Sequence, residues 1–162
     1  MKLLKDQIES LRYINHLWPV LILRLYISFF FFSRYSEKLG MDFLGKPKLS
    51  ARIDEFLYST GPPAWIQVFF VDYVQESWAV WAGLFTNLEW SFGVLFLIGF
   101  LNRPGAIIAM LYLYMMSFIS SPAEQMQLLP ITMILVALMV FGSGRVGGVD
   151  YFFYKRKRGL LW

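Results

Sequence analysis

The feature that most constrains the fold is an apolar run at residues 78–101, WAVWAGLFTNLEWSFGVLFLIGFL, with a glutamate inside it. Crossing about 30 Å of hydrocarbon takes roughly 20 apolar residues in a helix, and this run is long enough. A carboxylate at the centre of such a helix is costly unless it is paired or serves a function. The run therefore predicts a membrane-spanning helix, and Glu89 is its first candidate functional residue.

The composition agrees with a membrane protein. Of the 162 residues, 57% are hydrophobic and 16% are charged, whereas soluble domains average roughly 45–50% and about 25%. Three more segments, 17–35, 104–121 and 128–144, approach the length of a span. We therefore predict an all-α fold, in which residues 1–162 form one polytopic membrane domain built on a bundle of four transmembrane helices.

The segments between and beyond these spans carry more polar residues. Residues 1–16 have apolar positions at helical spacing, which predicts an amphipathic helix at the membrane interface. The link at 36–77 is too long for a simple loop, and a Gly-Pro-Pro break at 61–63 divides it. We expect two short interfacial helices there, on the outer side of the membrane, and a basic tail at 145–162.

The distribution of lysine and arginine predicts the orientation. The basic cluster YKRKR at 154–158 follows the last apolar segment, and basic residues beside a span mark its cytoplasmic end. This position favours a membrane-flanking role over nucleic-acid binding. We expect a multi-pass membrane protein, surrounded by membrane lipids, with both termini in the cytoplasm.

Cysteine is absent and His16 is the only histidine. Disulfides, a Cys-X-X-Cys redox pair, thiolate zinc sites and iron–sulfur ligation are thereby excluded within this chain. We predict no metal site and no cofactor held by the chain's own ligands. Because no self-sufficient catalytic set is visible, any redox chemistry would depend on an organic molecule or on a partner subunit.

Arg24 and Glu89 are the two charges buried within the apolar segments. Unpaired, each would cost about 2.5–3.5 kcal/mol at the centre of a helix, so we expect them to form an ion pair. One face of the second helix carries Ala82, Thr86, Glu89 and Gly93. The small residues on this face let the backbone of a neighbouring helix approach closely. The pair is either a structural link between two helices or part of a ligand or proton site.

The second helix also has an opposite side, which carries larger residues such as Phe85 and Phe92, suited to lipid or to packing. Between the third and fourth spans, Glu124 is expected to be a solvated residue of an outer loop.

Short motifs in three helices resemble those of the DoxX/DoxD family of small four-helix membrane proteins. Ser28 and Tyr35 replace family glycines, and the long aromatic link resembles the DoxD branch. The matching positions are Arg24, Ser28, Phe31, Tyr35 and Lys38 in the first helix, Glu89, Gly93, Gly99 and Arg103 in the second, and Gly142, Gly144, Arg145 and Asp150 after the fourth.

The resemblance implies a subunit of a thiosulfate:quinone oxidoreductase in a bacterial or archaeal plasma (inner) membrane. It leaves two hypotheses open. In one, the chain is mainly a structural or partner-docking subunit that contacts other membrane or membrane-associated proteins. In the other, it binds a quinone, with Arg24 and Glu89 at a quinone oxygen and Tyr26, Trp90 or Tyr112 near the ring.

Overall fold

The computed structural model describes residues 18–141, 144 and 148–150. Within them the fold is all-α, as predicted, and the described residues form no strand. The predicted amphipathic helix at 1–16 and most of the basic tail at 145–162 lie outside the described residues.

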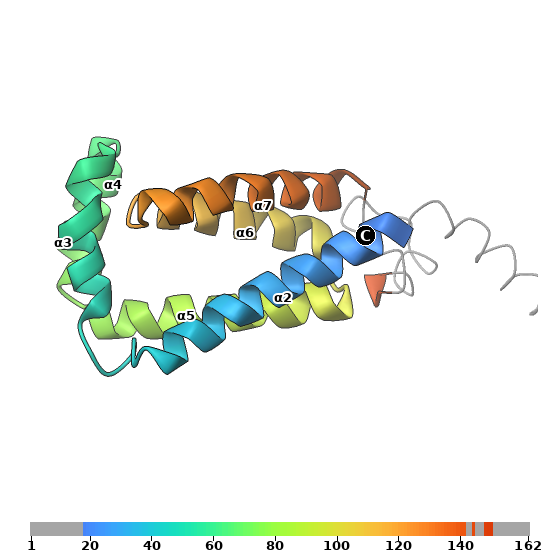
Figure 1. Ribbon diagram of the computed structural model, residues 1–162, viewed down its shortest axis with the longest axis horizontal. Helices are drawn as coiled ribbons and strands as arrows, with labels where there is room; N and C mark the ends of the chain where they lie inside the picture. The colour runs from blue at the N-terminus through green and yellow to red at the C-terminus, as the bar shows by residue number, and fades with distance from the viewer. Residues whose placement is uncertain (1–17, 142–143, 145–147, 151–162) are drawn as a thin grey trace, which may run out of the picture.

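Four long helices alternate in direction and form two packed pairs (Figure 1). Helix α2 packs against α5, and α6 packs against α7; further contacts join α2 to α7 and α5 to α6. The helices are α2 (Trp18–Gly40), α5 (Trp78–Ile98), α6 (Asn102–Ser117) and α7 (Pro122–Phe141).

The link between α2 and α5 folds into shorter helices that lie across one end of the bundle (Figure 1). They are α3 (Lys48–Thr60), α4 (Ala64–Val68) and the π-helical turn η1 (Phe69–Gln75). Gly61 ends α3 in the left-handed conformation, with φ of 59°, and two prolines follow it. The side chains of Leu49, Ile53 and Leu57 are buried, so the apolar face of α3 is directed into the protein.

The helix boundaries differ from the expected spans. Helix α2 continues five residues past the predicted end at 35, and α7 begins six residues before the predicted start at 128. In the described part of the chain, α5 and α7 are long and apolar enough to cross a membrane. Helix α6 has only 16 residues, and α2 carries several charged side chains.

The α2–α5 contact depends on small groups. Ser28 of α2 donates a hydrogen bond of 2.7 Å to the carbonyl of Gly93, and the ring of Phe32 lies where a side chain at Gly93 would be. As predicted, Ala82, Thr86, Glu89 and Gly93 are buried. Phe85 and Phe92 are buried as well, because neighbouring helices also cover the parts of α5 that flank the small-residue face.

At the end of the bundle opposite α3, the segment around Asp150 closes the α5–α6 junction. The Asp150 carboxylate accepts hydrogen bonds from the backbone amides of Leu101, at 2.7 Å, and Asn102, at 3.1 Å. It therefore caps the N-terminus of α6, whose amides have no partner within the helix. The amides of Val149 and Asp150 bond back to the carbonyls of Ile98 and Gly99.

Gly99 has no room for a side chain in this junction. Its φ is +73°, and a Cβ would lie 2.6 Å from Nη1 of Arg24 and 2.8 Å from the Cα of Gly148. By contrast, Gly83 lies within α5 and has nothing within 4 Å of the equivalent position.

We predict that Gly99→Ala lowers the thermal unfolding midpoint of the purified protein, because backbone strain of about 1–2 kcal/mol adds to displacement of Arg24. The matched control, Gly83→Ala, should leave the midpoint unchanged or raise it, since alanine favours the helix by up to about 1 kcal/mol. Equal midpoints for the two variants would contradict this account of the junction.

Candidate functional site

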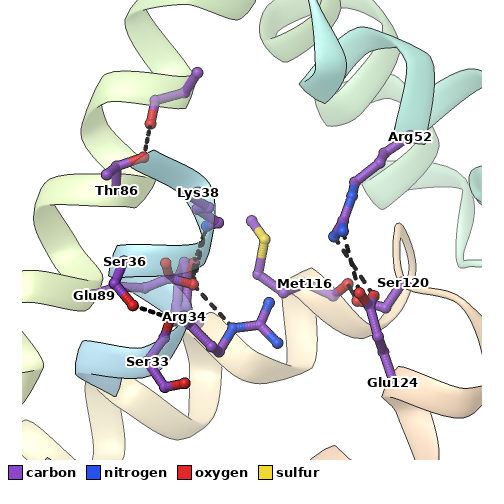
Figure 2. Close-up of polar contacts among 12 residues, drawn as sticks. Ser33, Arg34, Ser36, Lys38, Arg52, Thr86, Glu89, Met116, Ser120 and Glu124 are labelled. Atoms are coloured by element: carbon purple, nitrogen blue, oxygen red, sulfur yellow. Dashed lines mark hydrogen bonds and ion pairs between the residues drawn. The ribbon is translucent and has the colours of Figure 1, made fainter. Parts of the chain in front are cut away.

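The candidate site is a cluster of three polar side chains around the buried carboxylate of Glu89, two of which, Arg34 and Lys38, are labelled in Figure 2. Oε1 of Glu89 lies 2.9 Å from Nζ of Lys38 and 3.1 Å from Nε of Arg34. The hydroxyl of Tyr112 donates to the same oxygen at 2.7 Å. Lys38 also lies 3.3 Å from the Tyr112 hydroxyl. The cluster therefore joins α2, α5 and α6.

Helical spacing brings these groups together. Arg34 and Lys38 are four residues apart and so lie on the same side of α2. Lys38 continues the buried face of that helix, which also includes Ile27 and Phe31. Glu89 lies near the middle of α5, and Tyr112 belongs to the buried face of α6.

The predicted ion pair between Arg24 and Glu89 is wrong. The salt bridges of Glu89 go to Arg34 and Lys38. Arg24 is buried next to Gly99 and Gly148, with Asp150 as a nearby negative charge. Since Gly99 is about 15 Å from Glu89 along the helix axis, the two charges belong to opposite regions of the bundle.

Arg34 and Lys38 were not predicted as partners of Glu89, because Arg34 stands at the polar end of the first predicted span and Lys38 lies beyond its end at residue 35. The sequence does contain a pattern that indicates Lys38: it follows Ile27 and Phe31 at helical spacing, so the buried face of the helix continues into the charged segment.

The other predicted pocket residues are divided between the inside and the outside of the bundle. Tyr112 contacts Glu89 directly. Tyr26 and Trp90 have exposed fractions of 51% and 48%, and their side chains lie on the outer surface of α2 and α5. Their proximity to a ligand ring stays a prediction, as does the contact of Arg24 with a quinone oxygen.

A cavity of about 210 Å³ adjoins the cluster between α2, α3 and the start of α7. Arg34 and Lys38 line it, so both side chains contact Glu89 on one side and the cavity on the other. Further charged lining residues are Glu37, Lys48, Arg52, Glu55 and Glu124, and the apolar part of the lining comes from Met41, Phe43 and Ala51.

An ion pair crosses the cavity lining from α3 to α7. Arg52 donates two hydrogen bonds to the carboxylate of Glu124, at 3.1 and 3.5 Å. The prediction that Glu124 is a solvated loop residue is therefore wrong: it lies in the first turn of α7, with its side chain 28% exposed. Removing one partner of such a half-exposed pair costs less than removing one partner of a buried pair.

One oxygen of Glu89 is left for other chemistry. Oε2 is buried and has no hydrogen-bond partner among the described residues. Arg34 uses Nε on Glu89, and its two terminal nitrogens point away from the carboxylate (Figure 2). A buried acceptor beside cationic and hydroxyl donors is able to hold a polar ligand atom or to accept a proton.

A family model described as "TQO small subunit DoxD" matches residues 20–160. The chain belongs to the DoxD family. The predicted family resemblance is thereby confirmed, and the chain is a member of a family of membrane proteins. A search among curated proteins and a search among solved structures each return no match.

The family motifs of this DoxD protein divide between two buried clusters. Lys38, Glu89 and Gly93 belong to the candidate site or to the α2–α5 contact beside it. Arg24, Gly99, Gly144 and Asp150 gather at the opposite junction, where a Cβ on Gly144 would collide with the Asp150 carboxylate. In the described ranges no group of three or more His, Cys, Asp or Glu side chains is arranged to hold a metal ion.

We predict that Glu89→Gln destabilises this DoxD protein by about 3–5 kcal/mol, because it leaves Arg34 and Lys38 buried without a counter-charge. Glu124→Gln, the matched substitution in the half-exposed pair, should cost about 1 kcal/mol or less. Thermal unfolding of both purified variants in one detergent measures the difference. A Glu124→Gln effect as large as that of Glu89→Gln would contradict the assignment of Glu89 as the central charge.

Proposed function

We propose that this DoxD protein is the membrane subunit of a thiosulfate:quinone oxidoreductase-type complex, and that it binds the quinone head group at the Glu89 cluster. The observation that carries the proposal is the buried Glu89 carboxylate, held by Arg34, Lys38 and Tyr112 with Oε2 unpartnered among the described residues, next to a cavity. Family membership supports the type of complex.

The residues fit the chemistry of a quinone head group. A quinone carbonyl needs hydrogen-bond donors, and Arg34, Lys38 and Tyr112 carry them. A quinol hydroxyl needs an acceptor, which Oε2 of Glu89 supplies. The cavity of about 210 Å³ is smaller than the roughly 300–1,000 Å³ of sites for drug-sized ligands. It therefore suits a single ring more than a long isoprenoid tail.

When bound, a quinone supplies the acceptor for two electrons and two protons. The chain's own residues would orient the head group and manage the protons. The positive charges of Arg34 and Lys38 favour negative charge on an oxygen beside them. Glu89 holds these two cations in place, and its free oxygen can carry a proton.

The proposal includes four membrane spans formed by α2, α5, α6 and α7, with both termini in the cytoplasm of a bacterial or archaeal cell. The packing of α2 against α5, and of α6 against α7, supports an arrangement in which all four helices run along one common axis across the membrane. Helices α3 and α4 would then lie at the outer surface. The exposed Trp65 and Tyr73 are suited to the membrane–water interface there, where aromatic side chains concentrate.

We predict that a cysteine placed at Ala64 reacts with a membrane-impermeant maleimide added to intact cells, since Ala64 is exposed at the α3 end. The chain has no cysteine of its own, so labelling reports this one position. Gly159→Cys, in the expected cytoplasmic tail, should react only after the cells are lysed. Labelling of Gly159→Cys in intact cells would overturn the orientation.

A second candidate function is a purely structural subunit that docks partner proteins. The exposed aromatic side chains of Tyr58, Trp65 and Tyr73 around α3, α4 and η1 favour it, because aromatic residues are enriched in protein interfaces. In that case the Glu89 cluster holds three helices together and binds no quinone.

We predict that the complex purified from native membranes in mild detergent contains extractable quinone, and that Tyr112→Phe reduces affinity for decylubiquinone about tenfold, as expected for one lost hydrogen bond of about 1.4 kcal/mol. Tyr114→Phe, on the exposed side of α6, is the matched control and should bind like the unaltered protein. Intact complexes without quinone, and with equal binding in both variants, would instead support the structural candidate.

A further inference from the structure

We propose that the cavity at the α3 end is the route by which protons reach Glu89, with Lys38 as the residue that relays them. The inference rests on the proposed function, because it assigns a proton supply to the same carboxylate. It adds a direction of access, from the α3 end, and a residue for the transfer step.

Lys38 lies between the buried carboxylate and the cavity. Its Nζ lies 2.9 Å from Oε1 of Glu89 and 3.3 Å from the Tyr112 hydroxyl, and the same side chain lines the cavity. Glu89 itself is fully buried. Among the described lining residues, only Lys38 and Arg34 also contact Glu89.

Arg34 and Lys38 differ in their ability to release a proton. A guanidinium does not release its proton under conditions that proteins tolerate, whereas a buried lysine ammonium does. Arg34 therefore supplies fixed charge, and Lys38 is the group able to pass a proton on.

The transfer is a balanced exchange of protons without electron transfer. An N–H bond of the Lys38 ammonium breaks and an O–H bond forms on Glu89, which becomes neutral. The neutral amine then takes a proton from a hydronium ion in the cavity. The carboxylates of Glu37 and Glu55 on the cavity lining are acceptors that can hold such protons close to Lys38.

The charges around Lys38 come from every side of the site. Arg34 lies one turn away on α2, Glu89 and Tyr112 face it from α5 and α6, Arg52 acts from α3, and Glu124 lies on the cavity lining from α7. The positive charges of the two arginines and the negative charges of the two glutamates nearly balance. Lys38 can therefore lose and regain a proton without leaving a large net charge in the protein interior.

The opposite end of α5 offers a contrast. There the amides of Val149 and Asp150 bond to the carbonyls of Ile98 and Gly99, and the Arg24 side chain fills the space beside Gly99. Protons entering from that end would have to pass this packed junction and about 15 Å of apolar helix before reaching Glu89.

The first test blocks the cavity. Ala51 is exposed and lines the cavity. Because the chain has no cysteine of its own, the variant Ala51→Cys can be modified at this one position with sulfonatoethyl methanethiosulfonate. The readout is the infrared band of the protonated Glu89 carboxyl, identified by its loss in Glu89→Gln. Its rate of hydrogen–deuterium exchange is followed after mixing the full-length protein in lipid nanodiscs with D₂O.

We expect modification of Ala51→Cys to slow this exchange about tenfold or more, in line with the loss of an assisted proton transfer. The same reagent on Ala64→Cys, which is exposed at the same end but does not line the cavity, should leave the rate unchanged. An unchanged rate in fully modified Ala51→Cys would overturn the route, as would a Glu89 carboxyl that never shows a protonated band in folded protein.

The second test addresses the relay. Lys38→Arg keeps the positive charge but cannot release a proton, so exchange should again slow about tenfold or more. Lys46→Arg, at an exposed lysine outside the cavity, is the matched control. Exchange at the unaltered rate in folded Lys38→Arg would exclude Lys38 as the relay. If that variant does not fold, the Ala51→Cys experiment still decides the route.

Neither test contains a quinone. A failed proton route therefore leaves the quinone-binding result of Tyr112→Phe as it stands, and an absence of bound quinone leaves the exchange measurement valid. The two proposals can fail separately.

Discussion

The convergence of Arg34, Lys38 and Tyr112 on one oxygen of Glu89 is the interaction on which the rest of the bundle depends. A lone carboxylate in the middle of an apolar helix would be expelled or neutralised. Two cations and a hydroxyl make its burial tolerable, and they can do so only if α2, α5 and α6 keep their mutual depth and rotation. Removing any one member of the cluster leaves a buried charge or polar group without one of its partners.

The small-residue contact between α2 and α5 follows from the same requirement. Ser28 and Gly93 let the two helices approach closely enough for the α2 cations to reach Glu89. At the far junction, Asp150 caps α6 and lies near Arg24, which sets the start of the helix that carries Tyr112. The charged clusters and the glycine positions thus form one set of geometric constraints.

The sequence predicts the fold class and the inward face of α5 because both depend on local patterns. Apolar length indicates helices, and the spacing of Ala82, Thr86 and Glu89 indicates which face is buried. The partner of Glu89 could not be chosen in this way. Arg24 looked closest because it was the other charge within an apolar segment, whereas the true partners lie beyond the apolar part of α2, on the same helix.

Depth explains that error in physical terms. A long cationic side chain near the end of a helix can reach toward the interior, so a residue outside the apolar segment can still reach a buried acid. The cavity was equally hidden from sequence reasoning, because its lining combines α2, α3 and α7, whose relative placement depends on the folded link. The family motifs include Lys38 and Glu89 of the first cluster but not Arg34 or Tyr112, and they do not indicate a grouping into two clusters.

The continuity of α2 from Trp18 to Gly40 has a consequence for how such a chain can change. Arg24 serves one cluster and Lys38 the other, and about 21 Å of uninterrupted helix fixes their separation. Inserting or deleting a single residue between them would turn one cluster by about 100° relative to the other, so both cannot stay in register. The stretch of α2 between Arg24 and Lys38 therefore acts as a spacer of fixed length.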